Sequence, residues 1–141
     1  MIGPLLSHLE DLEGSYAKTL RRQAHRYEDE HDVYHQCLTF AAAADKAGTL
    51  IEPLRQRYAG TSDWQTALPG DGKTLLEDLR SLYLMANAVA ATWAMALQAA
   101  KALRDTELKD VASSCQTEAE THAKWFLTRI KTGAPQALTV G

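Results

Sequence analysis

The chain has 141 residues, of which 45% are hydrophobic and 23% charged, and its formal net charge is −3. This length fits a single domain with a substantial core, and the composition excludes an intrinsically disordered chain. The slight excess of acidic residues provides no basic surface for nucleic acid or for an anionic membrane, so we expect neither as a partner.

The sequence also bears on cellular location. The segment Met1–Leu6 has no basic stretch followed by an apolar run, which is not the pattern of a secretory signal. The most apolar stretch, Ala88–Leu97, is shorter than the roughly 20 residues of a membrane span. Two cysteines, Cys37 and Cys115, are too few for a disulfide scaffold and lie on apolar faces. We therefore expect a cytoplasmic protein whose cysteines are buried free thiols.

Hydrophobic residues recur every three or four positions along four long segments, which is the period of an α-helix. The pattern predicts helices over about 5–26, 30–58, 73–104 and 107–132, within one domain spanning 1–141. Pro53 should kink the second helix or end it near Glu52, and Pro135 should close the fourth before a tail over 133–141. Thr106 is the predicted cap of the fourth helix.

Charge placement supports these boundaries independently. Acidic residues gather where each segment begins, for example at Glu28–Asp32 and at Glu77 and Asp78. Basic residues gather where segments end, for example at Arg55 and Arg57. This polarity matches the helix dipole and recurs in all four segments.

The connections between the predicted helices indicate the topology. Short links join the first helix to the second and the third to the fourth, so each pair forms an antiparallel hairpin. The link over 59–72 reaches roughly 45 Å when extended, about the length of the second helix. Trp64 and Leu68 favour a packed link over a solvated loop. We predict an all-α four-helix bundle with a long crossover between helices 2 and 3; the alternative is an up-down-up-down bundle.

Three polar residues interrupt the apolar stripes near mid-bundle. Glu13 lies in the stripe of the first helix, whereas Glu118 and His122 lie four residues apart in the stripe of the last. At the same height the second helix offers Ala41–Ala44, which leaves space for water or an ion.

Two segments carry a family resemblance: Glu118-Ala-Glu-Thr-His-Ala-Lys-Trp-Phe126 and Glu30-His-Asp-Val-Tyr-His-Gln-Cys37. With the crossover bundle, they resemble ferritin-like stress proteins of unknown function and small uncharacterised bacterial relatives. The resemblance implies metal ligands at Glu13 and Glu118, with His122 near the position of the last ligand. A di-iron site needs Glu-x-x-His pairs and further acids, which this chain lacks at mid-height. The implied cofactor is therefore one divalent ion, iron or zinc.

Other interpretations of the polar residues stay open. Glu13, Glu118 and His122 can instead form a buried polar cluster satisfied by Tyr16, Asn87 or water. The pair His31 and His35 has zinc-binding spacing, but no second pair accompanies it, and a solvated helix start is the simpler interpretation.

The third predicted helix suggests a partner. From Ala86 to Ala100 its polar residues are Asn87, Thr92 and Gln98, so it needs cover on more than one face. We expect a homodimer through this helix. Two functions follow: a ferritin-like protein whose minimal metal site binds rather than catalyses, or a metal-free scaffold that acts through oligomerisation or through a partner or small ligand. An enzyme with ordinary acid–base chemistry is the third alternative and ranks below these two.

Overall fold

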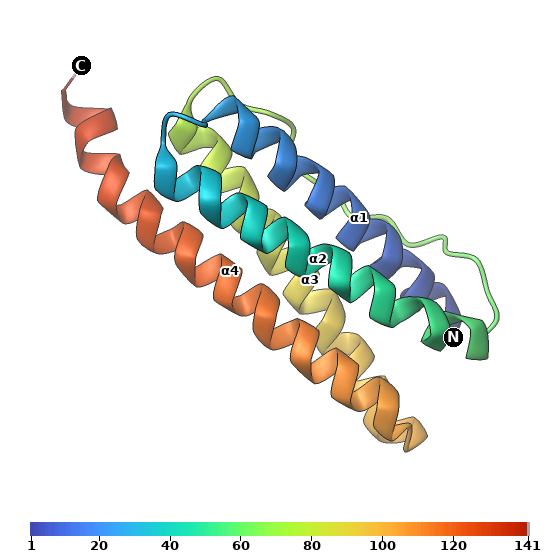
Figure 1. Cartoon of the computed structure of the whole chain (residues 1–141). Helices are drawn as coiled ribbons and strands as arrows, with labels where there is room; N and C mark the ends of the chain where they lie inside the picture. The colour runs from blue at the N-terminus through green and yellow to red at the C-terminus, as the bar shows by residue number, and fades with distance from the viewer. Residues whose placement is uncertain (141) are drawn as a thin grey trace.

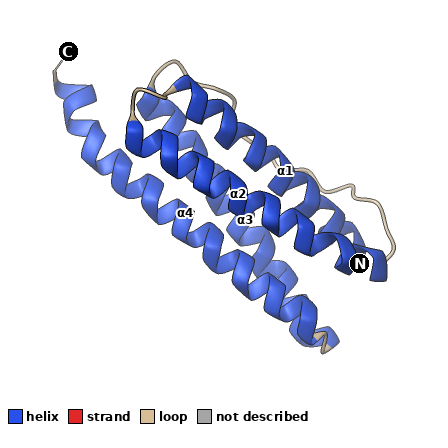
Figure 2. Cartoon of the chain, viewed as in Figure 1, coloured by secondary structure: helices blue, strands red, loops and turns tan. Residues whose placement is uncertain are grey.

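The computed structural model describes residues 1–140, and these form four α-helices and no strand. The helices are α1 (Ile2–Arg26), α2 (His31–Arg57), α3 (Leu75–Leu103) and α4 (Thr106–Thr139). They lie side by side along their lengths (Figures 1 and 2). The predicted all-α four-helix bundle is therefore confirmed.

Several predicted boundaries need correction. α4 continues through Gly133 and Pro135 to Thr139, so the predicted tail over 133–141 is helical as far as that residue. Pro53 also lies inside its helix: α2 ends at Arg57, close to the predicted end at 58 and beyond the alternative end near Glu52. A proline removes only one backbone hydrogen bond, and the helix on either side keeps its remaining bonds. The cap of α4 is Asp105 rather than Thr106, because the Asp105 side chain accepts a hydrogen bond from the Leu108 N–H.

Two hairpins make up the bundle. α1 packs mainly against α2, and α4 packs mainly against α3. The second hairpin turns sharply at Arg104, which has a left-handed backbone with φ of 56°. The Arg104 and Asp105 N–H groups donate to the Lys101 and Ala100 carbonyls, the nested pattern that closes a helix C-terminus. Contacts of α1 with α3 and of α2 with α4 join the two hairpins.

The link between α2 and α3 lies along α1 (Figure 1). Its first residues touch the start of α1, where a Cβ on Gly3 would lie 2.1 Å from the Ala59 carbonyl oxygen. Further along, Thr66 Oγ1 lies 2.7 Å from His8 Nε2. Near its end the Asp71 carboxylate accepts hydrogen bonds from Arg22 at the far end of α1. The link is thus tied to α1 from one end to the other.

The cores of the two hairpins merge around large apolar side chains, of which Trp93 and Phe126 are fully buried. By length and composition alone, α3 could cross a membrane. The sequence does not indicate this when only the shorter apolar stretch Ala88–Leu97 is considered. In the bundle 44% of its most apolar 18-residue stretch is buried, and a helix in the core of a bundle can have the same length and composition as a membrane span.

Candidate functional site

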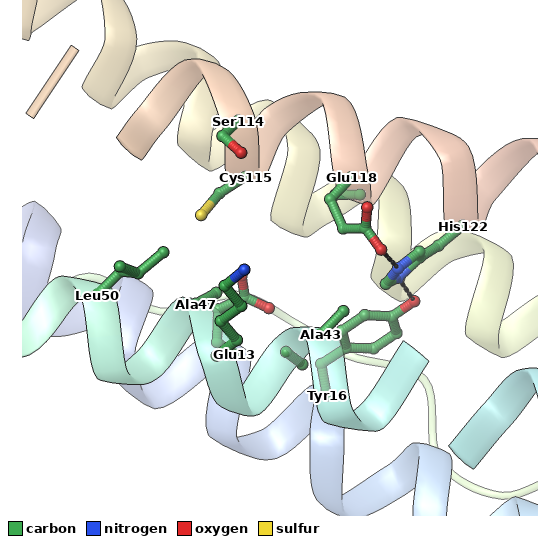
Figure 3. A pocket seen from close by; sticks show the side chains of 12 residues that line it. Glu13, Tyr16, Ala43, Ala47, Leu50, Ser114, Cys115, Glu118 and His122 are labelled. Carbon is green, nitrogen blue, oxygen red and sulfur yellow. Dashed lines mark hydrogen bonds and ion pairs between the residues drawn. The ribbon is translucent and has the colours of Figure 1, made fainter. Parts of the chain in front are cut away.

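A pocket of about 210 Å³ opens at the seam between the two hairpins, with α2 and α4 on its sides and α1 beneath (Figure 3). Its polar lining comes from Glu13 and Tyr16 on α1, Lys46 on α2, and Ser114, Cys115, Glu118 and His122 on α4. Its apolar lining is Ala43, Ala44, Ala47, Leu50 and Ala119. The small alanine side chains leave the space that larger residues would fill.

Glu13 forms the buried end of the pocket and is only 4% exposed. Its Oε2 accepts a hydrogen bond of 3.0 Å from the Trp93 indole N–H. Burial raises the pKa of the Glu13 carboxyl from 4.5 to about 7, an effect that the bond from Trp93 reduces and the nearby Glu118 charge increases. Among residues 1–140 Trp93 is the one hydrogen-bond donor to this carboxyl group, so Oε1 accepts no hydrogen bond. Figure 3 shows the carboxyl group directed into the pocket.

A hydrogen-bonded chain runs along the wall of the pocket. His122 Nε2 lies 3.0 Å from Glu118 Oε1, and His122 Nδ1 lies 2.9 Å from the Tyr16 hydroxyl oxygen. A carboxylate only accepts, so Nε2 carries the proton and Nδ1 accepts from Tyr16. Burial lowers the pKa of His122, which keeps the ring neutral. Phe40 stacks on the imidazole with ring centroids 3.8 Å apart, which fixes the orientation of the ring.

The structure brings the three predicted ligands to one pocket but not to one point. Glu118 and His122 are paired, whereas Glu13 is directed to Trp93 on α3. Over residues 1–140, no three His, Cys, Asp or Glu side chains form a group able to hold a metal ion. Glu118 and His122 thus form a pair with each other, while Glu13 has its partner on α3.

The alternative interpretation of a buried polar cluster is closer to the observed contacts. Tyr16 is a partner of His122, as that interpretation allowed, but Asn87 is exposed and donates to the Tyr83 carbonyl. The Glu13 contact with Trp93 was missed. A signal for it existed, because the N–H of a buried tryptophan usually needs an acceptor.

The remaining candidate residues contribute no reactive group. Cys37 and Cys115 are buried and free, as predicted, and burial raises the pKa of each thiol to about 12. Both thiols are therefore protonated and poor nucleophiles. His31 and His35 are exposed at the start of α2 and belong to no group with three potential ligands in the described chain.

The fold and the site define an all-α bundle with a polar pocket at the seam of its hairpins. No family model, no curated protein and no solved structure matches the chain. Functional inference therefore rests on the residues of the pocket.

Proposed function

We propose that this protein binds a small ligand in the pocket between α2 and α4 and does not catalyse a reaction. The observation that carries the proposal is Glu13, a carboxyl group with one oxygen unpartnered at the buried end of a pocket of about 210 Å³. An ionisable group with a strongly raised pKa inside a cleft marks functional sites in general. Binding is favoured over catalysis because the pocket offers no activated nucleophile: the Cys115 thiol is protonated.

We also propose that the bundle is of the ferritin-like type. The path of residues 58–74 along α1 supports a long crossover between α2 and α3, which is the connection that ferritin-like folds use. In that class of bundle, ligands and ions sit between the helices at mid-height. The position of the pocket fits this rule.

A divalent metal ion is the second candidate ligand. It is favoured by Glu118 Oε1 and His122 Nε2, which lie 3.0 Å apart on the wall of the pocket that Glu13 also lines. Zinc would have to displace the Nε2 proton and approach each ligand atom to about 2.0–2.2 Å. Glu118 is half-exposed and free to adjust. Titration with Zn²⁺ and Fe²⁺ tests this candidate: metal binding predicts a raised melting temperature that Glu118→Ala and His122→Ala abolish.

The pocket itself is tested by filling it. Ala43 lines the pocket, whereas its exposed neighbour Ala42 does not. We expect Ala43→Leu to abolish the binding of small-molecule fragments followed by NMR, and Ala42→Leu to leave it unchanged. Fragments that bind both variants equally would place their site elsewhere and refute the proposal.

We propose in addition that the chain forms a homodimer through α3. No charged residue lies between Arg80 and Lys101, although Leu84 and Met95 in that interval are 48% and 42% exposed. A helix face turned to solvent normally carries charges. Sedimentation at micromolar concentration should show a dimer that Leu84→Glu converts to a monomer. A monomeric wild-type chain would contradict the proposal.

A further inference from the structure

We propose that the ligand of this pocket is a small organic amine, bound as its ammonium ion with the nitrogen against Glu13. This inference rests on the proposed function of the pocket and names the chemical class of its ligand. It follows from the hydrogen-bonding groups, the charges and the size of the pocket.

The hydrogen-bonding groups that Glu13, Tyr16 and Glu118 leave free are acceptors. The Trp93 N–H is taken by Glu13, the Tyr16 O–H by His122, and the His122 N–H by Glu118. What remains is Glu13 Oε1, the unused lone pair of the Tyr16 hydroxyl and the second oxygen of Glu118. A primary ammonium group has three N–H donors and no acceptor, so it complements such a surface. The free donors of the lining, Lys46 and Ser114, belong to exposed residues, so a ligand carboxylate would find its donors there and not beside Glu13.

The charges favour the same class of ligand. Glu13 and Glu118 are the acidic groups of the lining, and burial lowers the pKa of His122, which keeps that ring neutral. The basic residue of the lining, Lys46, is exposed, and its charge lowers the pKa of the Cys115 thiol, whereas the charge that acts on the Glu13 carboxyl is that of Glu118. A cation placed at the buried end therefore meets negative potential, and it relieves the repulsion between the two carboxyl groups.

The spacing of the acceptors distinguishes an ammonium ion from a metal ion. A metal draws its ligand atoms to about 2.0–2.2 Å, so those atoms must lie close together. A hydrogen-bonded nitrogen keeps its acceptors at about 2.7–3.2 Å, so they can lie further apart. Glu13 and the pair formed by Glu118 and His122 share the pocket without forming a metal-binding group among residues 1–140. This looser arrangement suits an ammonium ion.

The rest of the pocket fits an apolar body. Its walls carry the methyl groups of Ala43, Ala44, Ala47 and Ala119, which offer contact but no hydrogen bond. Benzene fills a cavity of about 150 Å³, so a pocket of about 210 Å³ accepts a slightly larger molecule. The ligand is thus a monoamine with roughly eight to ten non-hydrogen atoms.

The test compares three probes of similar size: 2-phenylethylamine, 2-phenylethanol and phenylacetate. Binding is followed through the indole N–H resonance of Trp93, which is bonded to Glu13. We expect 2-phenylethylamine to shift this resonance and to bind at least tenfold more tightly than the alcohol, and phenylacetate not to bind. Glu13→Gln keeps an acceptor for Trp93 but removes the charge, and it should weaken amine binding at least tenfold.

Matched variants separate the outcomes. Glu120 is exposed on α4 outside the pocket, so Glu120→Gln should leave the amine affinity unchanged. Glu118→Gln provides a second test should Glu13→Gln not fold, and it should weaken amine binding severalfold. Equal binding of the amine and the alcohol would overturn the amine assignment and leave the ligand pocket standing. If no probe shifts the Trp93 resonance, the amine assignment and the proposed pocket function both fall.

Discussion

Replacing Glu13 by glutamine should stabilise the protein at neutral and alkaline pH. The folded state raises the pKa of this carboxyl from 4.5 to about 7, chiefly because the group is buried. The folded protein therefore binds the proton more tightly than the unfolded chain does. Stability from this group is fully present below pH 4.5 and is lost as the pH rises through about 7.

The size of the expected gain in stability follows from the change in the pKa of Glu13 on folding. A difference of about 2.5 pKa units corresponds to about 3 kcal/mol of free energy of unfolding. Glutamine has no proton to lose and keeps a carbonyl oxygen for the Trp93 N–H. We expect Glu13→Gln to match the wild type near pH 4.5 and to exceed it by up to about 3 kcal/mol at pH 8.

Urea unfolding followed by circular dichroism measures this difference. With a denaturant slope of about 2 kcal/mol/M, the variant midpoint at pH 8 should lie about 1.5 M above that of the wild type. Glu52→Gln, at an exposed position on α2, controls for the loss of a surface charge. Parallel pH profiles of wild type and Glu13→Gln would show that burial does not hold the proton on Glu13, and the reasoning would be refuted.

Three further predictions concern the frame around the pocket. Gly3→Ala should destabilise the protein by several kcal/mol in thermal melts, because the new Cβ would meet the backbone of the link. Gly14→Ala, which has open space around it, should stabilise the protein by about 0.5–1 kcal/mol. Equal effects of the two substitutions would contradict the packed link. Arg104→Gly should raise the free energy of unfolding by up to about 1 kcal/mol, because glycine adopts the left-handed conformation without strain. Tyr16→Phe should cost about 1–3 kcal/mol, because it removes the buried donor to His122, and an unchanged urea midpoint would argue against that bond.

The sequence predicted the helices well because two independent signals agree in each of them. Apolar residues recur at helical spacing, and acids and bases mark the two ends. The ends themselves were harder to place, since a helix tolerates one missing hydrogen bond. Pro135 was therefore interpreted as a stop, although α4 continues to Thr139.

The site was predicted in part. Spacing along one helix places Glu118 and His122 on the same face, and the structure pairs them. Spacing does not fix how far each helix rotates about its axis. That rotation directs Glu13 to the indole of Trp93, 80 positions away, rather than to the histidine. Helical spacing identifies which residues are buried in the bundle. Which side chain each buried residue contacts on another helix depends on how the helices pack.

The identity of residue 13 separates a structural from a functional explanation of the pocket. Trp93 needs one hydrogen-bond acceptor, and a glutamine at this position would supply it without placing a charge in the core. The need for that acceptor therefore does not explain a carboxyl group, which costs about 3 kcal/mol of stability at alkaline pH. A cationic ligand does explain it, since it would interact with the free oxygen and favour the ionised form. The two readouts of Glu13→Gln should thus move in opposite directions, with stability rising and amine affinity falling. A variant that gains stability and keeps its affinity for 2-phenylethylamine would show that the carboxyl group does not hold the ligand.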